Sequence, residues 1–195
     1  MEIISLTPKN GQQIVCYAAQ AIQAGKVIIA PTDTVYGLIA DAGNKKAVAR
    51  LYAIKRRDSS RYLPIFVKNI AMAKKLAPIS KKTQKLLEEK WPGKFTFILP
   101  RKPAKIFGVD KKTIALRIPH YPFLNSLLET LNIPLCGTSA NISGQKATTK
   151  IDQALAQFQN SDPKPDLVIN AGDLADSFPS QIIDLTQKEP LIIRQ

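Results

Sequence analysis

The stretch that decides the fold is Val27-Ile28-Ile29-Ala30-Pro31-Thr32-Asp33-Thr34-Val35-Tyr36-Gly37-Leu38. Its first four residues are apolar and end at a proline, which predicts a short buried strand over residues 27–30. Ligands of open α/β sheets bind beyond the carboxyl ends of the strands, so we expect Thr32 and Thr34 to face a site. A turn in which Asp33 and the two threonines bond to the local backbone explains the same residues without a ligand.

Predicted helices and strands alternate along the rest of the chain. Apolar residues at helical spacing predict helices over residues 12–24, 47–54, 70–76, 81–91, 123–131 and 151–158. Short apolar runs predict further strands over residues 63–67, 95–99, 113–118, 134–139, 167–170, 181–186 and 191–194. This alternation favours an α/β fold in which helices cover a twisted mixed sheet.

The length of 195 residues fits one domain, and no stretch rich in Pro, Gly or Ser divides the chain. We therefore expect a single domain over residues 1–195. The segment from Pro100 to Lys112 is the one most expected to be mobile, because it lacks a periodic apolar pattern. Trp91 is expected in the core, and His120 has no nucleophile beside it that would suggest a catalytic triad.

The charge balance is the unusual feature of the composition. Lys plus Arg is 28 and Asp plus Glu is 15, which gives a net charge of +13. Such a balance predicts attraction to anions: nucleotides, nucleic acid or an acidic membrane surface. No apolar run is long enough for a membrane span. Two cysteines and one histidine predict neither a disulfide framework nor a zinc site, and a reduced cytoplasmic compartment is expected.

Three further segments carry groups that bind anions. Residues Lys55-Arg56-Arg57, with Arg61 four residues on, follow a predicted helix; the helix dipole accounts for one or two of these cations, and phosphate binding is the alternative. Arg117 lies within an apolar strand, where an unpaired charge is costly, so it should face a polar cleft or a partner. Residues 138–144 form a run of small hydroxyl and amide side chains after a strand, which is typical of an anion-binding loop or of an ordinary turn.

Taken together and in this order, these segments resemble the YrdC family, called TsaC in bacteria. The family's P-T-D/E-T-x-Y-G-L hallmark matches Pro31 to Leu38, and its later motifs match in sequence. These are K-x-R at Lys55 to Arg57, P-G-x-x-T at Pro92 to Thr96, R-x-P at Arg117 to Pro119, S-A-N-x-S-G at Ser139 to Gly144, a serine at Ser180 and an arginine at Arg194. The similarity extends over nearly the whole chain.

The resemblance implies a YrdC-like α/β fold with a basic concave cleft, and L-threonylcarbamoyladenylate synthase activity. Such an enzyme converts L-threonine, bicarbonate and ATP into threonylcarbamoyl-AMP and diphosphate. The product feeds the threonylcarbamoyladenosine modification of tRNA through a separate transferase complex. ATP is then a substrate, and Mg²⁺ is expected with its phosphates, with no protein side chain identified as a metal ligand.

The resemblance also assigns expected roles to residues, none of them a covalent nucleophile. The threonine-binding residues would be Thr32, Thr34, Arg117, Ser139 and Ser180. The ATP-binding residues would be Lys55, Arg57, Arg61, Asn141 and Arg194. The chain departs from the family pattern at Asp58, at Tyr62 and at Phe66, where some relatives have histidine.

Two other functions fit the same residues. The net charge of +13 also suits a module that binds double-stranded RNA or tRNA without synthase activity. A similar domain occurs in hydrogenase-maturation carbamoyltransferases, which suggests a relative that handles a carbamoyl adenylate. That interpretation predicts carbamoyl phosphate as the substrate in place of threonine.

Overall fold

The computed structural model describes residues 1–194, which form six helices and one ten-stranded sheet. The strands are β1 (Glu2–Ser5), β2 (Ile28–Ala30), β3 (Gly37–Asp41), β4 (Ile65–Phe66), β5 (Phe95–Pro100), β6 (Thr113–Arg117), β7 (Leu135–Ser139), β8 (Leu167–Asn170), β9 (Gln181–Asp184) and β10 (Leu191–Arg194). The helices are α1 (Gly11–Gln23), α2 (Lys45–Lys55), α3 (Ile70–Leu76), α4 (Lys81–Glu88), α5 (Pro122–Leu131) and α6 (Ile151–Phe158).

The stretch around Pro31 joins two central strands of the sheet. Strand β2 pairs antiparallel with β3, and Ala30 lies opposite Gly37. The residues between them, 31–36, leave the sheet and form a loop at its edge. Every residue of β2 is buried, because helices pack against both faces of the sheet at this point.

The sheet is mixed, with the strand order β1-β8-β2-β3-β7-β4-β6-β5-β9-β10. Strands β1, β8 and β2 are parallel neighbours, as are β4 with β6 and β5 with β9. The other neighbouring pairs are antiparallel. The expected twisted α/β sheet is therefore confirmed.

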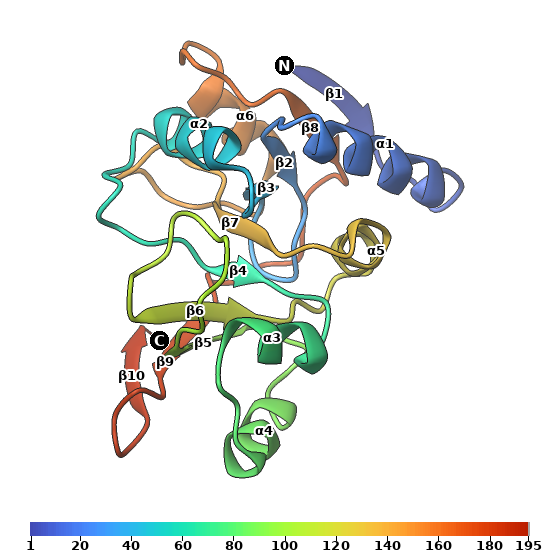
Figure 1. The fold of residues 1–195 in the computed structure, drawn as a ribbon. Coiled ribbons are helices and arrows are strands. Elements are labelled where there is room, and N and C mark those ends of the chain that lie inside the picture. The colour runs from blue at the N-terminus through green and yellow to red at the C-terminus, as the bar shows by residue number, and fades with distance from the viewer. Residues whose placement is uncertain (195) are drawn as a thin grey trace.

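Helices divide between the two faces of the sheet (Figure 1). Helices α1 and α5 pack together on one face, and α2, α6, α3 and α4 cover the other. Alternation along the strands separates the two cores: Ile28 packs with α1 and α5, whereas Ile29 packs in the larger core on the opposite face. Leu38 and Ile39 divide between the two cores in the same way, although Ile39 and its neighbours form one continuous apolar run.

Several elements differ from the sequence prediction. Strands β1 and β3 were not expected, and helix α4 ends at Glu88 instead of continuing to Trp91. Trp91 is buried and packs edge-to-face on Phe97, so its expected place in the core is confirmed. Within the described residues, no helix is both long enough and apolar enough to cross a membrane.

The segment from 101 to 112 contains no helix or strand. The Arg101 guanidinium lies inside it and donates hydrogen bonds to the carbonyls of Asp110, Ala104 and Ile106 at 2.9, 2.8 and 3.2 Å. Leu63 N also donates to Gly108 O at 2.7 Å. The arginine bonds brace the loop internally, and the Leu63 bond fastens it to the body of the protein; its mobility stays a prediction.

Candidate functional site

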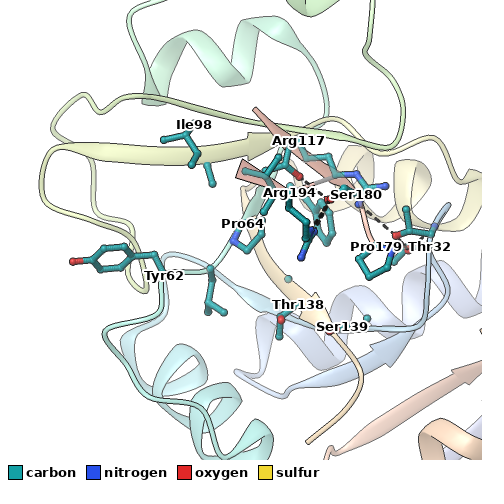
Figure 2. Close-up of a pocket in the computed structure, with 18 of the residues that line it drawn as sticks. Thr32, Tyr62, Pro64, Ile98, Arg117, Thr138, Ser139, Pro179, Ser180 and Arg194 are labelled. Atoms are coloured by element: carbon teal, nitrogen blue, oxygen red, sulfur yellow. Dashed lines mark hydrogen bonds between the residues drawn. The ribbon is translucent and has the colours of Figure 1, made fainter. Parts of the chain in front are cut away.

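A cavity of about 270 Å³ opens on the face of the sheet that α1 and α5 leave uncovered near β5 and β6. Alternation along these strands produces its wall. Thr96 and Ile98 of β5 line the cavity, whereas Phe97 between them is buried in the core on the other face. Thr113, Ala115 and Arg117 of β6 follow the same alternation. Figure 2 shows the labelled residues converging on this space from the loop after β2, from the segments that precede β4 and β9, and from strands β5, β6, β7 and β10.

The loop after β2 presents two threonine hydroxyls to the cavity. Thr32 Oγ1 donates to Val35 O at 2.7 Å and accepts from Thr34 N at 3.1 Å. The two threonine hydroxyls lie 3.0 Å apart. The turn predicted for this loop therefore forms, and it also holds the Thr34 hydroxyl at the cavity wall.

Arg117 forms a buried ion pair with Asp33. Its Nη2 lies 2.7 Å from Asp33 Oδ1, and both side chains are about 95% buried, with exposures of 5% and 6%. Nε donates to Gly93 O at 3.1 Å, and Nη1 donates to Thr34 Oγ1 at 3.4 Å. Burial lowers the pKa of Arg117, while Asp33 opposes that shift. The expected polar partner of this arginine is confirmed.

Arg194 reaches the cavity from the last strand. Its Nε and Nη2 donate to Ser180 O at 3.0 and 2.6 Å, and Nη2 also lies 3.3 Å from Ser180 Oγ. The Ser180 hydroxyl is 2.9 Å from the Thr96 hydroxyl. Burial lowers the pKa of Arg194, and the neighbouring charges of Arg117 and Arg57 lower it further. The mutual repulsion of these cations favours a bound anion.

Arg57 is the third arginine on the wall, and the end of helix α2 places it there. Arg56 adopts a left-handed conformation with φ of 50°, which ends the helix and turns the chain toward the cavity. Arg57 Nε donates to Arg61 O at 3.0 Å, and Nη2 donates to Tyr62 O at 3.3 Å. Burial lowers the pKa of Arg57, with a smaller contribution from Arg61.

Lys55 lies behind the wall and supports the end of β7. Its Nζ donates to Ser139 O at 2.7 Å and to Asn141 Oδ1 at 2.9 Å, and it lies 3.1 Å from Asn141 O and 3.3 Å from Ser139 Oγ. The residue is 2% exposed. Burial and the nearby charge of Arg57 lower the pKa of Lys55 to about 7. Ser143 N donates back to Lys55 O at 2.8 Å, so the helix end and this loop are joined twice.

Phe66 of β4 forms the floor between Arg117 and β7. The Arg117 guanidinium carbon lies 5.9 Å from the centre of the Phe66 ring, a cation–π distance. A Cβ atom on Gly137 would lie 2.2 Å from Phe66 Cε2. Only glycine therefore lets β7 approach this ring.

Seven of the ten residues predicted for the site line the cavity, namely Thr32, Thr34, Arg57, Arg117, Ser139, Ser180 and Arg194. Lys55 and Asn141 lie behind Ser139. The Lys55 ammonium donates hydrogen bonds to both Ser139 and Asn141. The Arg61 side chain is exposed and lies outside the lining residues, so only its carbonyl takes part here. The binding roles of all ten residues stay predictions.

Sequence reasoning missed several groups of the site. Asp33 was expected to serve only a local turn, but it pairs with Arg117 and also accepts a hydrogen bond from His120 N at 3.0 Å. Thr96 on the wall was quoted only as the last residue of the P-G-x-x-T motif and was given no role, and Asp110 was not singled out. The strand alternation of β5 would have shown that Thr96 faces the cavity, whereas the loop position of Asp110 has no periodic signal.

The described residues contain no group of three or more His, Cys, Asp or Glu side chains arranged to hold a metal ion. Asp110 is the one carboxylate among the residues that line the cavity within the described chain. The donors of the site are instead guanidinium groups and hydroxyls, which bind anions. A Mg²⁺ ion would therefore find its ligands mainly on a phosphorylated substrate.

The fold and the site define an α/β protein whose cavity is cationic and lined with hydroxyls. The chain belongs to the Sua5/YciO/YrdC family, because the family model described as "Telomere recombination" matches residues 20–195. The predicted family membership is thus confirmed.

Curated relatives are similar over nearly the whole chain. A Methanocaldococcus jannaschii protein with the provisional name threonylcarbamoyl-AMP synthase is 34% identical over 195 residues, which cover 100% of this chain and 91% of that protein. Proteins named threonylcarbamoyl-AMP synthase are 31% identical in Pyrococcus abyssi and 30% identical in Bacillus subtilis, over 98% and 95% of this chain. The chain spans 56% and 54% of those two relatives, so it matches about half of their length.

Two solved structures share the fold. The crystal structure of P. abyssi Sua5 complexed with L-threonine superimposes with a TM-score of 0.90 and 31% identity, over 100% of this chain and 57% of that one. The crystal structure of Escherichia coli YciO gives a TM-score of 0.83 and 25% identity, over 100% of this chain and 94% of that one. The family thus contains proteins named as synthases and proteins known only as YciO.

Proposed function

We propose that the protein is a threonylcarbamoyl-AMP synthase, which forms threonylcarbamoyl-AMP and diphosphate from L-threonine, bicarbonate and ATP. The observation that carries this proposal is the convergence of three arginines and several hydroxyls on one cavity. Guanidinium groups bind phosphate and carboxylate with paired donors, and the substrates carry both groups. The names of the relatives support the same activity.

The cavity wall suggests a division of labour between the substrates. Thr34, Ser139 and Ser180 offer hydroxyls, and Arg117 offers a guanidinium, to the amino acid L-threonine. Arg57 and Arg194 are the cations proposed to hold the phosphates of ATP. Their lowered pKa values still leave arginine charged at neutral pH.

Four predicted residues act less directly in this proposal. Thr32 holds the Thr34 hydroxyl, and Lys55 with Asn141 holds the segment after β7 that carries Ser139. The Arg61 side chain does not line the cavity, so it would contact the phosphates of ATP only if residues 58–62 moved. In the proposed enzyme, Thr32, Lys55 and Asn141 hold other groups in place, and Arg61 contacts the substrate only after the loop moves.

The reaction needs positioning and charge stabilisation more than a protein nucleophile. The threonine amine attacks bicarbonate, which gives a carbamate and water. A carbamate oxygen then attacks the α-phosphorus, and diphosphate leaves with the electrons of the broken P–O bond. Arg57 and Arg194 would stabilise the charge that develops on the phosphates, and the fixed hydroxyls would orient the carbamate. Mg²⁺ would enter with the triphosphate and neutralise part of its charge.

We place this activity in one domain over residues 1–195, in the cytoplasm, at the start of tRNA threonylcarbamoyladenosine formation. The product is a mixed anhydride, so a transferase complex that accepts the threonylcarbamoyl group must follow. Direct binding of tRNA or double-stranded RNA is compatible with the net charge of +13.

The test incubates the purified protein with ATP, Mg²⁺, bicarbonate and L-threonine, and measures diphosphate release and threonylcarbamoyl-AMP by mass spectrometry. Both should require L-threonine, and omission of threonine is the control. Carbamoyl phosphate in place of threonine and bicarbonate should give no adenylate. Turnover of carbamoyl phosphate with no response to threonine would instead identify a carbamoyl-adenylate enzyme.

An RNA-binding module is the second candidate, and the charge excess of the chain favours it. Binding to tRNA or double-stranded RNA should then weaken steeply between about 50 and 200 mM salt, because contacts to phosphates release counterions. Threonine-dependent turnover in the complete absence of RNA would show that RNA binding is not the basic activity.

A further inference from the structure

The cavity has two chemically different ends. Figure 2 shows Tyr62, Pro64 and Ile98 on one side, Thr32 and Pro179 on the other, and the two labelled arginines between them. The end near Tyr62, here called the Tyr62 end, is also lined by Leu63, Val109, Asp110, Thr113 and Ala115. It is therefore mostly apolar and contains one aromatic ring and one carboxylate.

This end suits a planar heterocycle. Apolar and aromatic walls bind flat rings, and a few polar groups fix their orientation. If the phosphates of the proposed substrate lie at the arginines, the base of the nucleotide extends to one of the two ends. The opposite end carries the hydroxyls of Thr32, Thr34 and Ser180 beside Pro179, so the more apolar Tyr62 end is the one whose surface better matches a base.

The Asp110 carboxylate is fixed in place at this end. Its Oδ1 accepts hydrogen bonds from Lys112 N at 2.7 Å and Thr113 N at 3.0 Å, and the Thr113 hydroxyl lies 3.4 Å away. All three contacts use Oδ1, which leaves Oδ2 available to Tyr62 or to a ligand. The backbone N–H of Lys112 and the Tyr62 hydroxyl lower the pKa of Asp110 to about 2. The group is therefore ionised, and accepts hydrogen bonds without donating, at every working pH.

We propose that Asp110 selects the base of the nucleotide, by accepting a hydrogen bond at Oδ2 from an exocyclic amino group on the edge of the base. The inference rests on the proposed function, since it takes a nucleoside triphosphate as the ligand. A carboxylate favours adenine, whose position 6 carries an amino donor, and repels hypoxanthine, which carries a carbonyl oxygen there. A site built to accept from an amino group rejects the analogue that lacks one, because its own acceptor is left unpaired.

Tyr62 is a positioning residue in this proposal. It departs from the family pattern in the sequence, and it is 47% exposed at the mouth of the cavity. The nearby Asp110 carboxylate raises the pKa of the Tyr62 hydroxyl. The ring forms part of the wall, and the hydroxyl would orient the carboxylate oxygen that meets the base.

The experiment compares binding of ATP and inosine triphosphate by calorimetry for the wild type and for Asp110→Asn. The asparagine Oδ1 can keep the bonds to Lys112 N and Thr113 N, while an NH₂ donor replaces Oδ2. The wild type should bind ATP at least about tenfold more tightly than inosine triphosphate, as expected for a hydrogen bond to a charged group. Asp110→Asn should abolish or reverse this preference.

Asp58→Asn is the matched control, because Asp58 is an exposed carboxylate on the neighbouring loop and outside the lining residues. It removes the same charge and should keep the wild-type preference for ATP. A third ligand, purine riboside triphosphate, lacks the amino group and should bind the wild type about tenfold more weakly than ATP. This comparison decides the question even if Asp110→Asn does not fold.

The outcomes separate the inference from the function on which it rests. Equal affinity of the wild type for all three nucleotides overturns the role of Asp110 and leaves the synthase proposal intact. An unchanged preference in folded Asp110→Asn also overturns it. A wild-type protein that binds no nucleoside triphosphate overturns the proposed function, and the inference with it.

Discussion

Replacing Asp33 by asparagine removes the carboxylate that pairs with Arg117 inside the cavity wall. Both side chains are almost fully buried and 2.7 Å apart, so water cannot replace the lost partner. Breaking a buried pair by removing one member costs about 3–5 kcal/mol, because the other charge remains desolvated and unpaired. We expect Asp33→Asn to lower the free energy of unfolding by about 3 kcal/mol, since asparagine keeps one acceptor for His120 N.

Together with Arg117→Met and the double variant, Asp33→Asn forms a double-mutant cycle. Arg117→Met should destabilise the protein by a similar amount, because it leaves the buried Asp33 carboxylate without its partner. With both charges removed, Asp33→Asn/Arg117→Met should be more stable than the sum of the single effects by at least about 1 kcal/mol. The double variant should still lack synthase activity, since the guanidinium that faces the cavity is gone.

The assay uses urea unfolding followed by fluorescence of Trp91. This residue is the single tryptophan of the chain, is buried, and lies two residues from Gly93, whose carbonyl accepts from Arg117. Midpoints and slopes for the wild type and the three variants give the four free energies. Single effects that add to within about 0.5 kcal/mol would refute the reasoning, because independent sites behave that way.

Three further variants test other parts of the site. Arg57→Ala should slow threonylcarbamoyl-AMP formation about 10²–10³-fold with the fold intact by circular dichroism, whereas Arg56→Ala, an exposed neighbour, should keep the wild-type rate. Lys55→Met should remove a contribution to stability that depends on pH. The pKa of Lys55 is about 7 in the folded protein and 10.5 in the unfolded chain, so between these pH values only the unfolded chain binds the proton. The free energy of unfolding of the wild type should therefore rise between pH 7 and pH 10 by up to about 4 kcal/mol. Urea unfolding at pH 7 and pH 10 measures this rise, and an equal rise in Lys55→Met would contradict it. Gly137→Ala should weaken L-threonine binding, because its Cβ displaces the Phe66 ring; unchanged calorimetric affinity would show that the ring moves freely.

The sequence predicted most of the fold because strong apolar periodicity marks most elements. It missed β3 because Leu38, Ile39 and Ala40 are apolar on both faces, and a short continuous run does not distinguish a strand from other buried segments. It missed β1 because this edge strand is largely exposed and is stabilised by parallel pairing with β8, which is distant in the sequence.

The site was predictable in its residue types and less so in its geometry. Arg117 had to find a polar partner, since it lies in an apolar strand, but only the fold reveals that the partner is Asp33. Lys55 was expected at the phosphates, yet the last turn of α2 places its ammonium against Ser139 and Asn141 behind the wall. The spacing of charged residues along the sequence does not reveal which way each side chain points at the end of a helix.

A double-label experiment tests the synthase proposal most directly. The protein is incubated with Mg²⁺, L-threonine, ¹³C-bicarbonate and ATP labelled at the α-phosphate. The products are then separated and identified by mass spectrometry. The proposal predicts one new compound that contains the bicarbonate carbon, the labelled phosphate and threonine, released together with an equal amount of diphosphate. Diphosphate release without threonine, or an adenylate that lacks the bicarbonate carbon, would contradict it.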